Sequence, residues 1–222
     1  MPKCGIIVST FFICICMAAA VCTKASMHDS GTASIRSIED IQEVPFQFLV
    51  VFDAEWMERE AEFYEEAEKA ELILEVRPTG QIQRHSFNIR QEVEVVRVLE
   101  AQQEVPDKIW IESYNGFYVF SEVSRDTLKN WGMTNILYPE WEYLVFLDQY
   151  SWAPGFYYNG HGMGGLRLTD QVDDMTLDDT KTYTYGELAG CEFFADSAET
   201  LEWLYGIKED LLNIYDPEGA DR

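Results

Sequence analysis

Basic residues are scarce in this sequence. It holds 16 Lys and Arg against 40 Asp and Glu, for a formal net charge of −24. Because this charge repels phosphate backbones and anionic lipid surfaces, the composition excludes nucleic acid as a partner and favours cations or basic proteins. Histidine is scarce as well. The three histidines, His28, His85 and His161, are too scattered to suggest a metal site.

Motifs of catalysis and cofactor binding are missing. The chain has no HExxH, CxxC, GxSxG or GxxxxGK[ST] pattern. Residues 160–165 (GHGMGG) match GxGxxG, but they follow an aromatic stretch and lead into a short strand. The dinucleotide motif instead follows a strand and opens a helix. We therefore expect no cofactor and no catalytic set.

Cysteine is almost confined to the N-terminus, where Cys4, Cys14, Cys16 and Cys22 fall within the first 25 residues. Beyond them only Cys191 remains, so a chain cleaved after residue 25 has no internal disulfide. A single cysteine in this setting is expected to be a small buried hydrophobe rather than a nucleophile.

Residues 1–25 are predicted to be a signal peptide. Lys3 precedes an uncharged run from Cys4 to Cys22, and small residues precede a cleavage site before Ser26. Two alternatives stay open: an uncleaved membrane anchor, because the run is nearly long enough to span a bilayer, and lipid attachment at Cys22. Against lipidation, Val21 stands where a lipobox has a small residue. The predicted location is secreted or cell-surface, with membrane contact only through this segment if it is uncleaved or lipidated.

The remainder reads as one globular domain, since 47% of the residues are hydrophobic and 14% aromatic. We expect a flexible spacer at 26–44, a single domain at 45–216 and a short tail at 217–222. Alternation and turn signals predict strands and helices along the domain. The expected strands are 45–52, 71–77, 87–99, 108–114, 141–147 and 166–168; the expected helices are 54–70, 125–131 and about 196–215.

The strand at 87–99 predicts a closed sheet. The apolar residues expected to face inward fall on odd-numbered positions up to Val95 and on even-numbered positions from Val96. Such a change requires a β-bulge, which lets a sheet bend sharply. The strand at 141–147 is apolar on both faces, so both should be covered. We therefore predict a mainly β fold: an OB-like curved barrel of five to six strands, with one helix before it and one C-terminal helix.

Two stretches are candidate sites. The aromatic, glycine-rich stretch 149–165 is the candidate ligand-binding surface, because aromatic faces on loops stack on sugars and peptides. Its candidate residues are Trp152, Phe156, Tyr157, Tyr158 and His161. In the alternative reading, these rings close one end of the barrel. The acidic stretch 170–179 supplies candidate calcium ligands, although it lacks the glycine and bidentate glutamate of an EF-hand loop. They are Asp170, Asp173, Asp174 and Asp178.

Four segments resemble an uncharacterised group of exported proteins of Gram-positive bacteria, often lipoproteins, that carry an OB-like barrel. They are Glu66–Glu75 (EAEKAELILE), Val93–Leu99 (VEVVRVL), Ile109–Ile111 (IWI) and Trp141–Leu147 (WEYLVFL). The resemblance covers about residues 53–170 and implies a fold but no catalytic residues. The chain departs from the group's pattern at residues 102–104, at 139–140 and in its lipobox.

These features together favour an exported cell-envelope or extracellular protein that acts as a non-catalytic binding module. Its expected partner is an extracellular glycan, a peptide or a basic protein. The alternative is a secreted hydrolase that uses acidic residues and His161 in the aromatic stretch.

Overall fold

The computed structural model describes residues 35–49, 57–58, 60–85, 88–113, 117–121, 126–130, 133–149, 155–159, 164–169 and 174–216. Its strands are β1 (Pro45–Phe48), β2 (Leu72–His85), β3 (Asn88–Ala101), β4 (Lys108–Ser113), β5 (Phe117–Ser121), β6 (Asp126–Asn130), β7 (Tyr143–Gln149), β8 (Phe156–Asn159), β9 (Gly165–Arg167) and β10 (Tyr183–Thr184). Its helices are the 3-10 turn η2 (Ile38–Ile41), α3 (Glu60–Lys69), α4 (Tyr185–Leu188) and α5 (Ala198–Tyr215).

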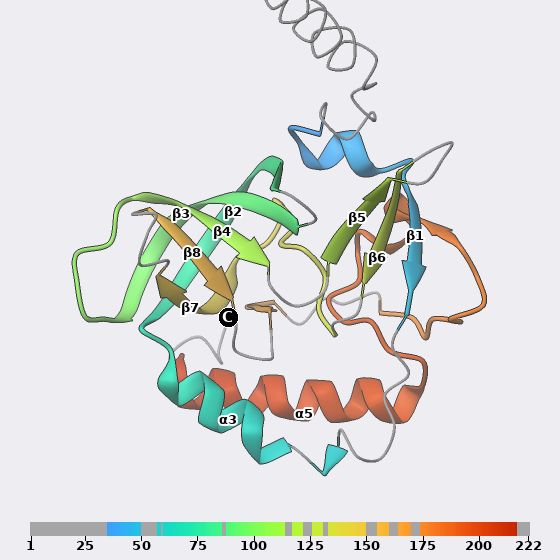
Figure 1. The fold of residues 1–222 in the computed structure, drawn as a ribbon. Helices are drawn as coiled ribbons and strands as arrows, with labels where there is room; N and C mark the ends of the chain where they lie inside the picture. The colour runs from blue at the N-terminus through green and yellow to red at the C-terminus, as the bar shows by residue number, and fades with distance from the viewer. Residues whose placement is uncertain are drawn as a thin grey trace, which may run out of the picture.

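Five strands close into a barrel. Around the ring the order is β3, β2, β7, β8 and β4, and β4 pairs again with β3. All neighbours are antiparallel except β4 and β8, which run parallel (Figure 1). A short additional strand, β9, pairs with β7. The predicted OB-like barrel is confirmed, with α3 before it and α5 at the C-terminal end.

The strongly bent hairpin of β2 and β3 confirms the predicted bulge. Val76 pairs with Val95 and Glu75 with Arg97, which leaves Val96 as an extra residue on β3. Val98 then lies opposite Leu74, so the phase does change as expected. Val96 and Val98 are nevertheless exposed at 45% and 47%. The bulge therefore bends the strand but leaves both valines exposed.

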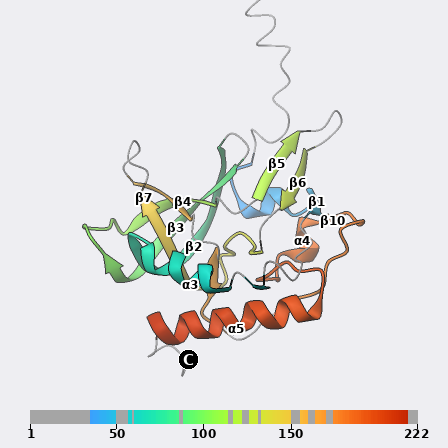
Figure 2. The same cartoon turned by 60° about the horizontal axis from the view of Figure 1, so that its bottom comes forward.

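A second group of strands extends from the start of β3. Asn88 pairs with Tyr118 of β5, and β6, β1 and β10 follow in order (Figures 1 and 2). Here the structure corrects two predictions. Residues 126–130 form strand β6 rather than a helix, because β6 pairs with both β5 and β1. The strand predicted at 71–77 instead continues to His85, with an irregularity between Pro78 and Ile82 where Gly80 takes φ +82°.

The apolar side chains form two cores. One lies inside the barrel and is largely aliphatic, with Leu72, Leu74, Val93 and Val145 among its members. The other lies between the outside of the barrel, β1 and the helices, and is richer in aromatic rings. Helix α5 runs beneath both the barrel and the second group of strands, as Figure 2 shows. Helix α5 therefore covers one side of the barrel.

The boundaries differ from the prediction at both ends. The expected spacer at 26–44 is ordered from residue 35, because Ile35, Ile38 and Ile41 pack into the second core. Helix α5 begins after Ser197, whose Oγ accepts the amide of Thr200 at 3.1 Å, rather than after Asp196. Within the described residues, no helix is both long and apolar enough to cross a membrane.

Candidate ligand-binding face

The aromatic stretch predicted as a loop contains a strand of the barrel. Phe156, Tyr157 and Tyr158 belong to β8, which pairs with β4 on one side and β7 on the other. Tyr157 points into the barrel and is 2% exposed, so its ring is part of the core. Phe156 and Tyr158 lie on the opposite, outer face and are half-buried. Trp152 and His161 fall outside the described residues.

The outer surface of β3, β4 and β8 forms a grid, which we call the aromatic face. Residues paired across neighbouring strands share a face. One row of the grid is Arg90, Glu112 and Tyr158; the next is Glu92, Trp110 and Phe156. Trp110, like Phe156 and Tyr158, is half-buried. The face therefore carries three aromatic side chains around charged groups, and no helix crosses in front of β4 and β8 in Figure 1.

A buried ion pair anchors this face. Arg90 donates from Nε to Oε2 of Glu112 at 2.7 Å, and the two side chains are 8% and 5% exposed. Asn88 donates to the other carboxylate oxygen, also at 2.7 Å. The guanidinium lies over the ring of Phe156, 4.7 Å from its centroid. Arg90 Nη2 is buried and has no hydrogen-bond acceptor among the residues described.

The other charges of the face pair with one another. Lys108 lies 2.9 Å from a carboxylate oxygen of Glu94 and 4.0 Å from one of Glu92. Glu92 also accepts a hydrogen bond from the Thr79 hydroxyl at 3.0 Å. The side-chain bond from Lys108 lowers the pKa of the Glu94 carboxyl. Each of these carboxylates already has a partner.

The candidate calcium ligands are not gathered into a site in the described part of the chain. Asp174 accepts the backbone amides of Glu192 and Phe193 at 2.5 and 3.2 Å. Asp178 accepts both the amide and the hydroxyl of Thr180. Asp170 and Asp173 lie outside the described residues. Among those described, no group of three or more His, Cys, Asp or Glu side chains could hold a metal ion.

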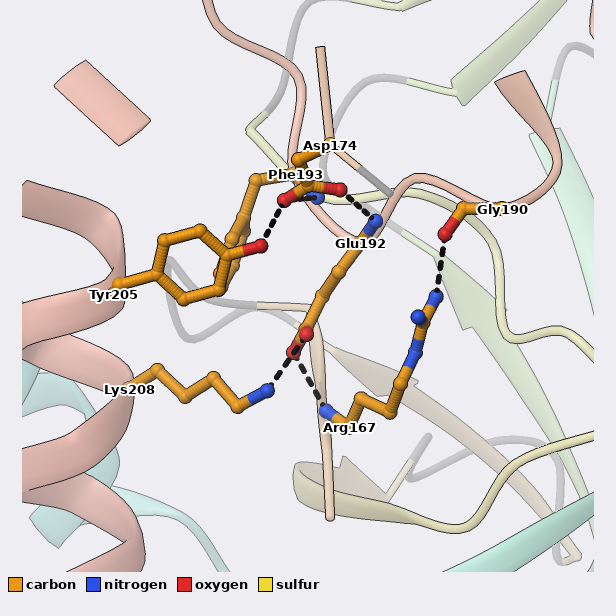
Figure 3. Close-up of polar contacts among 7 residues, drawn as sticks. All are labelled: Arg167, Asp174, Gly190, Glu192, Phe193, Tyr205 and Lys208. Carbon is orange, nitrogen blue, oxygen red and sulfur yellow. Dashed lines mark hydrogen bonds and ion pairs between the residues drawn. The ribbon is translucent and has the colours of Figure 1, made fainter. Parts of the chain in front are cut away.

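Asp174 instead belongs to a second set of buried charges, which we call the α5 cluster (Figure 3). Lys208 of α5 donates to Oε2 of Glu192 at 2.7 Å, and the backbone amide of Arg167 donates to Oε1 at 2.7 Å. Tyr205 of α5 donates its hydroxyl to Asp174. The Arg167 guanidinium bonds the carbonyl of Gly190 at 3.0 Å and lies over the ring of Trp141. The cluster thereby connects α5 to β9 and to residues 190–193.

Both carboxylates of the α5 cluster have raised pKa values. Burial raises the pKa of the Glu192 carboxyl, and Lys208 opposes the shift only in part. Burial also raises the pKa of the Asp174 carboxyl, against the bonds from Tyr205 and two amides. Each oxygen of both carboxylates has a hydrogen-bond donor. The cluster is therefore a structural connection, because buried carboxylates whose oxygens all have donors stabilise a single arrangement.

Two glycines of the GxGxxG match have a packing role. A Cβ atom on Gly165 would lie 2.3 Å from Leu137 Cδ2, and one on Gly164 would lie 2.2 Å from Thr134 Oγ1. Their lack of a side chain lets β9 approach the segment 133–138, whose Leu137 packs into the barrel core. There Gln91 bonds both the carbonyl and the amide of Leu137, at 2.7 and 2.8 Å.

The local sequence patterns do not select Arg90, Trp110 or Glu112 as ligand-binding residues. They indicate only that these residues belong to strands, because the neighbours Ile89, Ile109 and Ile111 carry the apolar alternation. One local signal does mark them: a tryptophan stands on the polar side of the strand 108–113. Their grouping with Phe156 depends on the pairing of β4 with β8, which no local pattern indicates.

Comparison with known proteins supplies no relative for this chain. No family model matches it, and neither the curated proteins nor the solved structures give a significant match.

Proposed function

We propose that the chain is an exported, non-catalytic binding module of the cell envelope or the extracellular space, and that it binds its ligand on the aromatic face. The observation that carries this proposal is the arrangement of Trp110, Phe156 and Tyr158 around the buried Arg90–Glu112 pair. Rings with a few fixed polar groups are typical of ligand surfaces. OB-like barrels often use the matching strands for binding, which is an analogy of fold.

Export is supported by the composition of the first 25 residues and by the resemblance to exported proteins. Intact mass and N-terminal sequencing of the protein, recovered separately from the medium and from the membrane fraction, test it. Cleavage as predicted gives a chain that starts at Ser26. A chain that keeps Met1 in the membrane indicates an anchor, and added diacylglycerol mass at Cys22 indicates lipidation. A full-length chain found only in the cytoplasm contradicts export.

Binding is tested with the protein purified from cells that express the full chain, applied to glycan and peptide arrays. We expect a ligand whose binding is lost in Trp110→Ala. The matched control is Trp203→Ala, which removes a half-buried tryptophan of α5 whose Nε1 bonds Glu60 at 2.8 Å. Circular dichroism and melting temperature establish that both variants fold. Equal binding by both variants, or binding to no probe, contradicts the proposal.

A further inference from the structure

We infer that the ligand of the aromatic face is a basic, proline-rich peptide in the polyproline II conformation, and that the indole of Trp110 donates a hydrogen bond to one of its carbonyls. The inference rests on the proposed function and names its ligand class. Trp110 differs from the other described tryptophans. The ring of Trp141 stacks on the guanidinium of Arg167, and Trp203 donates from Nε1 to Glu60 at 2.8 Å. The indole of Trp110 has no hydrogen-bond or ring partner among the described residues, and its Nε1 is open to solvent.

An open indole N–H favours a ligand that carries acceptor oxygens. Trp110 is half-buried, and a tryptophan in such a position usually has a hydrogen-bond partner for its N–H. A peptide in the polyproline II conformation has no internal hydrogen bonds, so its carbonyls are free to accept one. Its proline rings also pack against aromatic side chains. One ligand of this kind therefore uses both the ring and the N–H of Trp110.

The spacing of the rings fits the same conformation. Trp110 and Tyr158 stand diagonally on neighbouring strands, because Trp110 pairs with Phe156 and Tyr158 pairs with Glu112. With strands about 4.8 Å apart and about 6.6 Å between alternate residues, the Cα atoms of Trp110 and Tyr158 lie roughly 8 Å apart. Prolines three residues apart in polyproline II are separated by about 9 Å. Side chains cover the difference, so consecutive turns of the peptide can meet the two rings.

The charge of the protein favours a basic peptide over a glycan. The chain carries a net charge of −24, and Glu92 and Glu94 lie on the aromatic face. This field attracts a cationic ligand over a distance and repels an anionic one. Lysines at the ends of a peptide therefore add affinity without displacing Lys108 from Glu94. A neutral glycan could use the rings and the N–H of Trp110 but would gain nothing from the field.

The test is titration calorimetry of the wild-type protein, Trp110→Phe and Trp203→Phe against defined probes. The first probe is a decapeptide with proline at every third position and lysine at both ends. In the second probe alanine replaces proline, and in the third glutamine replaces lysine. A hexasaccharide of β-1,4-linked glucose is the neutral probe. Trp110→Phe keeps an aromatic ring but removes the indole N–H, and Trp203→Phe is the matched control.

We expect the first peptide to bind more tightly than the other three probes. Its affinity should fall about tenfold in Trp110→Phe, which loses one hydrogen bond, and stay unchanged in Trp203→Phe. The advantage of the lysine peptide over the glutamine peptide should shrink as the salt concentration rises, because salt screens the field.

Should Trp110→Phe not fold, ¹⁵N spectra of the wild-type protein report on the same contact, since the indole resonance of Trp110 should shift when the first peptide is added. Binding of this peptide that leaves both the Trp110→Phe affinity and this resonance unchanged overturns the role of Trp110. Equal binding of the alanine or the glutamine peptide overturns the ligand class. Binding of the hexasaccharide alone, lost in Trp110→Ala, also overturns the ligand class and leaves the proposed function standing. No binding on the arrays or in the titrations overturns both.

Discussion

Two buried ion pairs among the described residues are built from similar groups and differ in how their hydrogen-bond donors are used. Lys208 of α5 pairs with Glu192, and both carboxylate oxygens of Glu192 have a donor. Arg90 and Glu112 lie at the aromatic face, and their carboxylate is equally well bonded, but the cation keeps an unused donor. The two ion pairs therefore differ in how the donors of the cation are used and not in the burial of their charges.

The largest expected effect comes from breaking the α5 cluster. Glu192→Ala leaves Lys208 buried without its partner, so the free energy of unfolding should fall by about 3–5 kcal/mol, as measured by urea denaturation. The double variant Glu192→Leu with Lys208→Met should lose much less, because no uncompensated charge is buried. A single variant as stable as the wild type would contradict the view that this pair is structural.

Replacing the cation of each ion pair by the other basic residue compares the two pairs directly. Lys208→Arg places a larger group in a buried cluster and should cost about 1–3 kcal/mol. Arg90→Lys keeps a cation beside Glu112 and removes the unpaired donor, so its cost should stay within about 1 kcal/mol. Thermal and urea unfolding measure both. A larger loss of stability in Arg90→Lys than in Lys208→Arg would indicate that the Arg90–Glu112 pair, and not the Glu192–Lys208 pair, is the structural one.

A smaller effect is expected at Tyr205. Tyr205→Phe removes the hydroxyl that donates to the part-buried Asp174, at a cost of about 1 kcal/mol in urea denaturation. Tyr64→Phe is the matched control, because the hydroxyl of Tyr64 in α3 donates to Asp210 of α5 at the protein surface. Its cost should be smaller, since exposed polar pairs contribute little. Equal costs would show that the α5 cluster behaves as a surface network.

The smallest effect is a dependence on pH. Because the pKa values of Asp174 and Glu192 are raised in the folded state, both groups hold a proton more tightly when folded than when unfolded. Their contribution to stability is full below the ordinary carboxyl values of 3.8 and 4.5 and is lost as the pH rises through the raised values. Lys208 and Arg167 are the cations that face them.

Acidification from neutral pH should therefore stabilise the wild type more than a variant with Asp174→Asn and Glu192→Gln. Urea denaturation of both proteins at pH 7, 6 and 5 measures the difference between their free energies of unfolding. Acidification also relieves the repulsion among the other acidic residues, but this effect is common to both proteins and cancels in the difference. Parallel pH profiles would contradict the raised pKa values.

Part of the candidate face was predictable. Phe156 and Tyr158 were selected from sequence as ligand-binding residues, and both lie on the aromatic face, although as members of a strand. Tyr157 was selected with them but points into the core, because successive strand residues alternate between faces. Arg90 and Glu112 could not be selected, since 22 positions separate them and only the pairing of β3 with β4 joins them.

The chain's local patterns determined its broad architecture: the mainly β barrel, the bulge at Val96, the C-terminal helix and the acidic character. Alternation, propensity and charge are properties of neighbouring residues, so they can be read without knowing the fold. Only the tertiary structure decided that residues 126–130 form a strand, that residues 35–44 join the core, and which charges meet. Strand pairing and burial depend on partners distant in sequence, and these partners override local preference. The sequence thus specified the barrel, and long-range pairing specified the aromatic face on it.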